Sequence, residues 1–170
     1  GVEQELQRLQ GALDRGLGLI QLRDRNLPPA ERLWFAESLM SLARPRKARV
    51  VVSEDETLAR RIGADGLHLT SANLRTCANR PDFEWVGASC HDAWELKQAE
   101  TLGLDYALLG PVLPTASHPG APVLGWEGFE RLVASSTLPV FARAGRRKTC
   151  WRQPKPTAPT ALPCCGAGEN

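Results

Sequence analysis

The sequence of 170 residues lacks any apolar run that approaches the roughly 20 residues of a membrane-spanning helix. It also lacks the basic and apolar start of a signal peptide, because its first residues, GVEQELQRLQ, are mostly polar. The five cysteines are odd in number and show no spacing typical of a metal site. We therefore expect no membrane partner and reduced thiols, as in a cytoplasmic protein.

The net charge of +2 hides an uneven distribution along the chain. Residues 143–170 contain six basic residues and one acidic residue, which leaves 15 basic and 18 acidic residues in 1–142. This longer part is mildly acidic and has no basic stripe interleaved with aromatic residues. Nucleic-acid-binding proteins present such a positive surface. We therefore expect no nucleic-acid partner.

Short apolar runs alternate along the chain with segments whose apolar residues repeat with a helical period. The apolar runs predict strands at 17–23, 48–53, 65–69, 85–90, 105–110 and 138–142. The periodic segments predict helices at 3–15, 30–43, 55–62, 93–102 and 126–135. Strands and helices that alternate with short connections are typical of an α/β protein with parallel strands.

The polar residues distinguish two α/β architectures. They gather at the ends of five different apolar runs, and His68, His91 and His118 all lie at such positions. A (β/α)8 barrel collects its site from the ends of many strands, whereas a doubly wound sheet concentrates its site at one switch point. The dinucleotide-binding pattern GxGxxG is also absent after the first apolar run. We therefore predict an α/β (β/α)8 TIM barrel, incomplete because its first and last strands are missing.

Four motifs and their order resemble one known family. They are QLRDR, ADGLHL, VGASCHD and LLGPVLPTASHPG, the last followed by GW, and the resemblance around them covers about residues 3–142. In these motifs the chain resembles the thiamine-phosphate synthase/TenI family. The segment LPTASHPGAPVLGW is most similar to the synthase-like C-terminal domain of MutT-type Nudix hydrolase fusions, although the chain has no Nudix box. The resemblance thus implies a possible fused Nudix domain upstream.

The resemblance implies an activity in thiamine biosynthesis. A synthase of this family joins a pyrimidine pyrophosphate to a thiazole phosphate, and Mg²⁺ helps the pyrophosphate to leave. Carried over by position, the implied catalytic residues are Arg23, Ser89 and His118. The implied substrate-binding residues are Gln21, Arg23, Arg25, Ser53, His68, Ser89, Thr115 and Ser117. Of these, Thr115 and Ser117 belong to the loop that meets the substrate phosphates.

The chain also departs from the family pattern. Ser53 and Glu54 replace an Asn-Asp pair, and Asn73 replaces a second metal-binding aspartate, which implies a weakened Mg²⁺ site at Glu54 and Asn73. His118 replaces a lysine and removes a fixed positive charge. TenI-type thiazole tautomerases use a histidine where this chain has Pro111, so His91 or His118 would have to serve instead. The alternatives are a synthase, a phosphate-binding domain without turnover, and a tautomerase.

The last 28 residues lack the family pattern. Residues 143–170 are rich in proline, contain three cysteines and show no hydrophobic period. When the codons that could encode APTALPCCGAG are read in a frame shifted by one base, they permit a peptide that resembles the family's last strand and phosphate loop. We therefore predict a barrel domain at 1–142 and a frame-shifted, disordered tail at 143–170.

Overall fold

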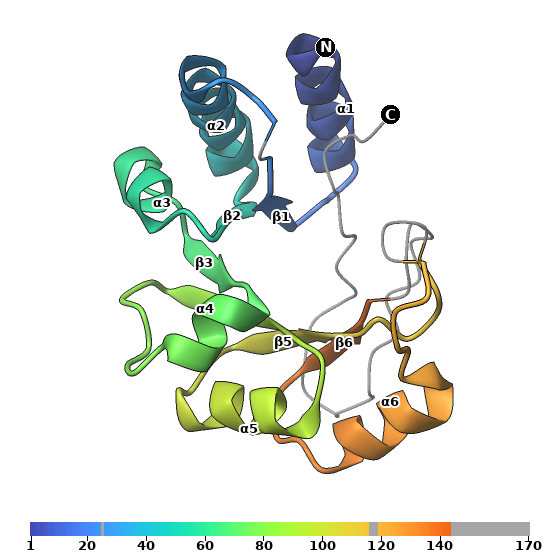
Figure 1. Ribbon diagram of the computed structural model, residues 1–170. Coiled ribbons are helices and arrows are strands. Elements are labelled where there is room, and N and C mark those ends of the chain that lie inside the picture. Colours follow the sequence, from blue (N-terminus) through green and yellow to red (C-terminus); the bar gives the residue numbers. More distant parts are fainter. Residues whose placement is uncertain (25, 116–118, 144–170) are drawn as a thin grey trace. The chain divides into compact units, whose positions relative to one another are not determined.

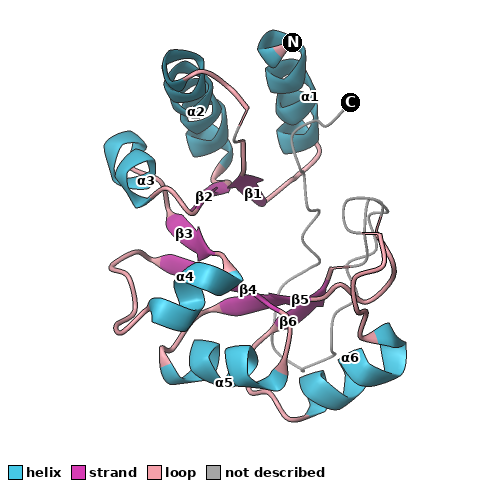
Figure 2. Cartoon of the chain, in the orientation of Figure 1, coloured by secondary structure: helices cyan, strands magenta, loops and turns pink. Residues whose placement is uncertain are grey.

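The structure is a computed structural model that describes residues 1–24, 26–115 and 119–143 (Figures 1 and 2). Helices and strands alternate along almost the whole described chain. In chain order they are α1 (Val2–Asp14), β1 (Leu19–Leu22), α2 (Pro29–Ala43), the 3-10 helix η1 (Arg44–Arg46), β2 (Arg49–Ser53), α3 (Glu56–Ile62), β3 (Gly66–Leu69), α4 (Ser71–Thr76), β4 (Trp85–Cys90), α5 (Ala93–Thr101), β5 (Tyr106–Leu109), α6 (Gly125–Ala134) and β6 (Val140–Ala142).

The chain divides into two compact units. The first comprises Gly1–Leu67, and the second begins at His68, so β3 starts in one unit and ends in the other. Within each unit the strands follow one another in chain order. The pairings β1–β2, β4–β5 and β5–β6 are all parallel. The alternation of helices with parallel strands makes this an α/β fold, as the sequence predicted.

The core of the first unit forms around β2. Val50, Val51 and Val52 are completely buried, so both faces of this strand are covered. The α2 helix contributes Phe35 and Leu39, which are also buried. A strand covered on both faces needs no polar alternation, which explains why the run of valines is continuous.

The core of the second unit is built on β4, β5 and β6. Helices α5 and α6 lie on the same side of these strands, and their buried residues include Leu96 and Phe129 (Figure 1). Gly87 of β4 lies directly opposite Tyr106 of β5 in the parallel register. A Cβ atom at Gly87 would lie 2.0 Å from Cζ of Tyr106, so the ring requires glycine at this position.

The turn from α3 to β3 fixes the register of the first unit. Gly63 ends the helix with a φ of 65°, and Ala64 donates its backbone N–H to the carbonyl of Ala59. Asp65 then contacts one residue of β2 twice. Its backbone N–H donates to the carbonyl of Val50, and its Oδ2 accepts the Val50 N–H at 2.7 Å.

The turn from α5 to β5 repeats this arrangement in the second unit. Gly103 has a φ of 67°, and Leu104 donates its N–H back into the helix. Asp105 donates its backbone N–H to the carbonyl of Val86 and accepts the Val86 N–H at 2.7 Å. Arg80 adds an ion pair to Asp105 at 2.9 Å. Both turns therefore align a strand with the strand before it through a single aspartate.

The predicted elements correspond closely to those of the structure. All six predicted strands and all five predicted helices are confirmed, with boundaries that shift by at most two residues. Helix α4 was not predicted, because its six residues are too few to show a helical period. The predicted tail lies outside the described residues, apart from Arg143.

Candidate functional site

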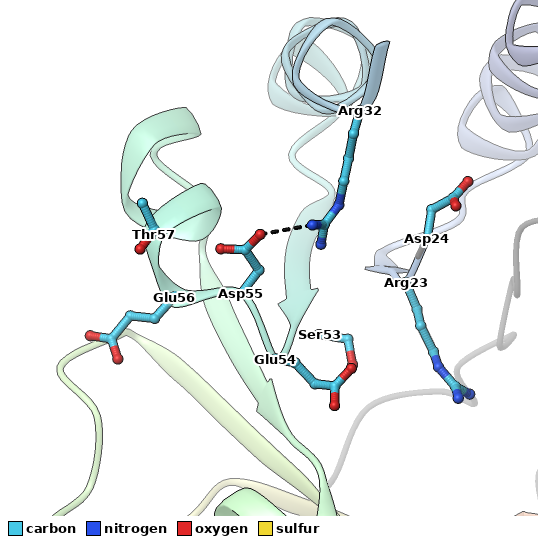
Figure 3. A pocket seen from close by; sticks show the side chains of 8 residues that line it. All are labelled: Arg23, Asp24, Arg32, Ser53, Glu54, Asp55, Glu56 and Thr57. Atoms are coloured by element: carbon cyan, nitrogen blue, oxygen red, sulfur yellow. Dashed lines mark hydrogen bonds and ion pairs between the residues drawn. The ribbon is translucent and has the colours of Figure 1, made fainter. Parts of the chain in front are cut away.

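The first unit contains a cavity of about 440 Å³ (Figure 3). It lies where β1 and β2 end, and the first turns of α2 and α3 complete it. Its lining residues are Arg23, Asp24, Arg32, Ser53, Glu54, Asp55, Glu56 and Thr57. The cavity is therefore lined mainly by charged side chains. Such a lining is suited to an anionic ligand that binds together with a metal cation.

A strained turn at the end of β2 directs Glu54 away from the strand. Glu54 has a φ of 67°, and Asp55 donates its N–H to the carbonyl of Ser53 at 2.8 Å, which closes a three-residue turn. A residue other than glycine in such a conformation costs about 1–3 kcal/mol, and such strain clusters at functional sites. The turn leaves Ser53 buried and exposes the carboxylate of Glu54 at the cavity (Figure 3).

Three of the acidic residues in the lining have structural partners. Asp55 caps α3 by accepting the N–H of Leu58 at 2.9 Å, and it also pairs with Arg32 at 2.8 Å. Asp24 accepts two backbone N–H groups of the loop that follows it. Glu56 pairs with Arg60 one helical turn later. These carboxylates therefore act in capping and pairing within the unit.

A buried polar network crosses the strands of the second unit. Nδ1 of His68 lies 3.0 Å from the hydroxyl of Tyr106, and Nε2 lies 2.8 Å from Oγ of Ser89. The rings of His68 and Tyr106 are stacked with their centroids 5.7 Å apart. His68 is 1% exposed, while Ser89 is half-buried. The network therefore holds the Ser89 hydroxyl from the interior side.

A second cluster joins the starts of α4 and α5 around the carboxylate of Glu95, which is 1% exposed. It accepts hydrogen bonds from the hydroxyl of Ser71, from Nε of Arg75 and from the backbone N–H of His91. Nδ1 of His91 also lies 3.3 Å from Glu95, and Nε2 faces Arg143 at 3.5 Å. Because these donors satisfy the buried carboxylate, the cluster stabilises the junction of the two helices.

The loop after β5 is anchored where it begins. Gly110 and Pro111 are joined by a cis peptide bond, and Val112 donates its N–H to the carbonyl of Arg143. A Cβ atom at Gly110 would lie 2.5 Å from that carbonyl oxygen. The carbonyl of Pro111 in turn accepts the N–H of Leu124. The described part of this segment is thus held by backbone hydrogen bonds, as in a rigid loop.

The structure places the predicted site residues in different surroundings. Arg23, Ser53 and Glu54 line the cavity, while Gln21 lies in β1 and outside its lining. His68 and Ser89 are bonded to each other in the second unit. Thr115 is half-buried after the anchored loop. The predictions that concern Arg25, Ser117 and His118 lie outside the described residues.

Asn73, the second predicted metal ligand, lies on α4. It is exposed, and its Oδ1 accepts a hydrogen bond from the hydroxyl of Thr70 at 2.8 Å. Within the described residues, no group of three or more His, Cys, Asp or Glu side chains is arranged to hold a metal ion. Magnesium at phosphate sites commonly takes one or two carboxylates and completes its shell with water and phosphate oxygens. The exposed carboxylate of Glu54 fits that mode.

The described part of the chain also contains a buried cysteine, Cys90. Burial raises the pKa of the Cys90 thiol to about 12, with smaller contributions from Glu95 and Asp92, so Cys90 is unsuited to act as a nucleophile. Among the described helices, none has the length and apolar character needed to cross a bilayer. Sequence reasoning missed Arg32 and Tyr106 as site residues, because a helical arginine and a strand aromatic are common without any function.

Comparisons with known proteins identify the relatives of this chain. The family described as thiamine monophosphate synthase matches residues 2–152. The thiamine-phosphate synthase of Levilactobacillus brevis is 35% identical over 144 residues, covering 78% of this chain and 65% of that protein. The enzyme of the same name from Pyrococcus furiosus is 31% identical over 147 residues, covering 85% of this chain and 70% of that protein.

A solved structure supports the same relationship. It is that of thiamine phosphate pyrophosphorylase from Pyrococcus furiosus, which superposes with a TM-score of 0.69 at 31% identity. The match covers 85% of this chain and 70% of that one, so the chain spans about two thirds of the length of these relatives. The sequence match, the identity to these relatives and the shared fold lead to one conclusion: the chain belongs to the thiamine monophosphate synthase family.

Proposed function

We propose that this thiamine-phosphate synthase-like domain catalyses the joining of a pyrimidine pyrophosphate to a thiazole phosphate, with release of pyrophosphate. The observation that carries the proposal is the strained turn that directs Glu54 into the cavity that Arg23 also lines. A pyrophosphate leaving group needs cationic groups around its oxygens and a carboxylate to hold a divalent cation. The lining of this cavity contains both kinds of group.

The arginine stabilises the leaving group as the bond to it breaks. Arg23 is exposed at the end of β1, and no other described residue forms a hydrogen bond with its side chain. A guanidinium donates two parallel hydrogen bonds to phosphate oxygens, which makes it suited to the negative charge that develops on pyrophosphate. Gln21 and Arg25 remain predicted neighbours of this group.

Ser89 is the predicted contact to the organic part of the substrate. Its hydroxyl is fixed by His68, whose other ring nitrogen is fixed by Tyr106. If the tyrosine hydroxyl donates to Nδ1, Nε2 donates to Ser89, and the serine proton is then directed to a substrate acceptor. The buried network thereby decides whether Ser89 donates or accepts a hydrogen bond.

Magnesium is the cofactor that we propose, with Glu54 as its carboxylate ligand and Asn73 as a weaker predicted one. When bound, the ion supplies charge neutralisation for the departing pyrophosphate. The fit rests on the exposure of Glu54 at the cavity and on the preference of Mg²⁺ for few protein ligands.

Product formation from the two substrates tests the function. We expect magnesium-dependent product from the wild type, and a decrease on the order of 100-fold in Arg23→Ala and Glu54→Gln. Glu37→Gln is the matched control, because Glu37 is exposed on α2 and lies outside the cavity lining. Wild-type activity in Glu54→Gln, or wild-type protein without product, would refute the proposal.

The second candidate function is a domain that binds thiamine-related phosphates without turnover. The observation that favours it is Asn73, a neutral side chain whose oxygen already accepts a bond from Thr70. Calorimetry that detects thiamine phosphate binding by a chain without synthase activity would support this alternative. A TenI-type tautomerase remains a third proposal, since Pro111 offers no proton donor and His91 or His118 would have to act.

The proposal also includes the complete fold, the cellular location and the ancestry of the domain. We propose a (β/α)8 barrel to which this chain contributes six strands, a location in the cytoplasm, and an ancestry in a Nudix hydrolase fusion. The buried thiol of Cys90, which is free, suits a reducing compartment. The genomic sequence upstream tests the fusion, because an in-frame Nudix domain is its expected result.

A further inference from the structure

We propose that Arg32 binds the pyrophosphate leaving group directly and that Asp55 holds its guanidinium in place for this purpose. The inference rests on the proposed function, because it assigns a ligand to the same cavity. It concerns a residue that no motif of the sequence indicates.

The position of Arg32 places a second guanidinium at the cavity. It lies in the first turn of α2 and extends toward the end of β2 (Figure 3). Its Nη1 donates to Oδ2 of Asp55 at 2.8 Å, while Oδ1 of the same carboxylate caps α3. The guanidinium is therefore oriented by a carboxylate that is itself fixed to a helix end.

The hydrogen bonding of Arg32 is incomplete within the unit. A guanidinium has five N–H groups, and the described residues accept only one hydrogen bond from it, at Asp55. Nε is buried without a partner, whereas Nη2 is not among the buried unpaired atoms and forms no hydrogen bond with a described residue. A residue that served only to join α2 to α3 would be expected to use its buried donor. The donors of Nη2 are available to an anionic oxygen.

The guanidinium groups of the lining can donate hydrogen bonds to an anionic oxygen. Asp24, Asp55 and Glu56 are each engaged by partners within the unit. The lining also contains the guanidinium groups of Arg23 and Arg32 and the exposed carboxylate of Glu54. Guanidinium groups bind phosphate oxygens and a carboxylate binds magnesium, so this set of groups suits a pyrophosphate with a bound magnesium ion.

Calorimetry with inorganic pyrophosphate and MgCl₂ tests the assignment. We expect Arg32→Met to weaken binding by about 10-fold to 100-fold, as for the loss of a charged hydrogen bond. Arg32→Lys should lie between it and the wild type, because lysine keeps the charge and loses the planar fork. Arg32→Met that binds as tightly as the wild type, or a wild type that does not bind magnesium pyrophosphate, would overturn the inference.

Arg46→Met is the matched control for a structural role. Arg46 pairs with Asp14 at 2.7 Å and joins η1 to the end of α1, outside the cavity lining. We expect this variant to melt at a lower temperature and to bind pyrophosphate as the wild type does. If Arg46→Met weakened binding as much as Arg32→Met, the effect would be structural and the inference wrong.

A product assay separates this inference from the proposed function. Binding that depends on Arg32 in a chain that forms no product would uphold the inference and refute the synthase. Product formation by Arg32→Met with an unchanged KM for the pyrimidine pyrophosphate would uphold the synthase and refute the inference. A raised KM for that substrate alone is the result that both proposals predict.

Discussion

Replacing Gly87 by alanine tests the packing beneath the buried polar network. The added Cβ would lie 2.0 Å from Cζ of Tyr106 and 2.3 and 2.4 Å from its two Cε atoms. Carbon atoms pack at about 3.5–4.0 Å, so the ring would have to move by more than an ångström. The ring is 5% exposed and stacks on His68, so it cannot move without loss of its present contacts.

The expected cost follows from two contributions. Overpacking of a core costs about 1–3 kcal/mol, and loss of the Tyr106–His68 hydrogen bond costs about 0.5–1.5 kcal/mol. The sum, about 1.5–4.5 kcal/mol, corresponds to a decrease in melting temperature of roughly 3–18 °C for a chain of this size. We expect circular dichroism to detect this decrease as a shift of the thermal transition.

Two further variants test whether the cost arises from the contact between residue 87 and the ring of Tyr106. Tyr106→Ala removes the three atoms nearest to the new Cβ, so Gly87→Ala should cost nothing more in that background. Gly128→Ala in α6 is the matched control, because its Cβ would meet Leu124 at an ordinary 3.7 Å and should gain stability. A Gly87→Ala melt within about 2 °C of the wild type, or additive costs in the double variant, would refute the reasoning.

Three other predictions concern single residues. Asp105→Ala leaves the Val86 N–H without its acceptor, so unfolding should become easier by about 1–3 kcal/mol, and an unchanged urea midpoint would contradict this. The Thr137 N–H lowers the pKa of Glu100 from 4.5, so its stabilisation is complete above that pH and is lost as the pH falls through the lowered pKa. Glu100→Gln should therefore melt below the wild type at neutral pH and equally in strong acid; equal melts at neutral pH would disprove it. Cys90, with its pKa raised to about 12, should resist iodoacetamide until urea unfolds the chain, as peptide mapping would show, and labelling of folded protein would count against it.

The strands could be predicted because their burial leaves a direct pattern in the sequence. The run at 48–53 contains three adjacent valines, and the structure buries all of them in β2. Helix α4 could not be predicted in this way, because its stability depends on the cap at Thr70 and on the bonds that Ser71 and Arg75 make to Glu95. Those contacts join residues that lie 20 or more positions apart.

Site residues that directly follow strands could be predicted from the sequence. Site residues that reach the cavity only through tertiary contacts could not. Arg23 and Glu54 directly follow apolar runs, and both line the cavity. Arg32 is identified only by its approach to Asp55, 23 residues later in the chain. The positive φ of Glu54 has no sequence signal either, since glycine or asparagine would be the usual residue there.

The equivalent positions of Asp65 and Asp105 have a consequence for how this fold tolerates amino-acid substitutions. Each holds its strand in register through backbone atoms of the neighbouring strand, at Val50 and Val86. Register therefore depends little on which side chains stand at the opposite, carboxyl ends of the strands, where chemistry is located in such folds. Evolution can exchange the catalytic end of one strand at a time while the amino end keeps the sheet aligned. A laboratory library confined to the carboxyl ends should accordingly retain a large share of folded members.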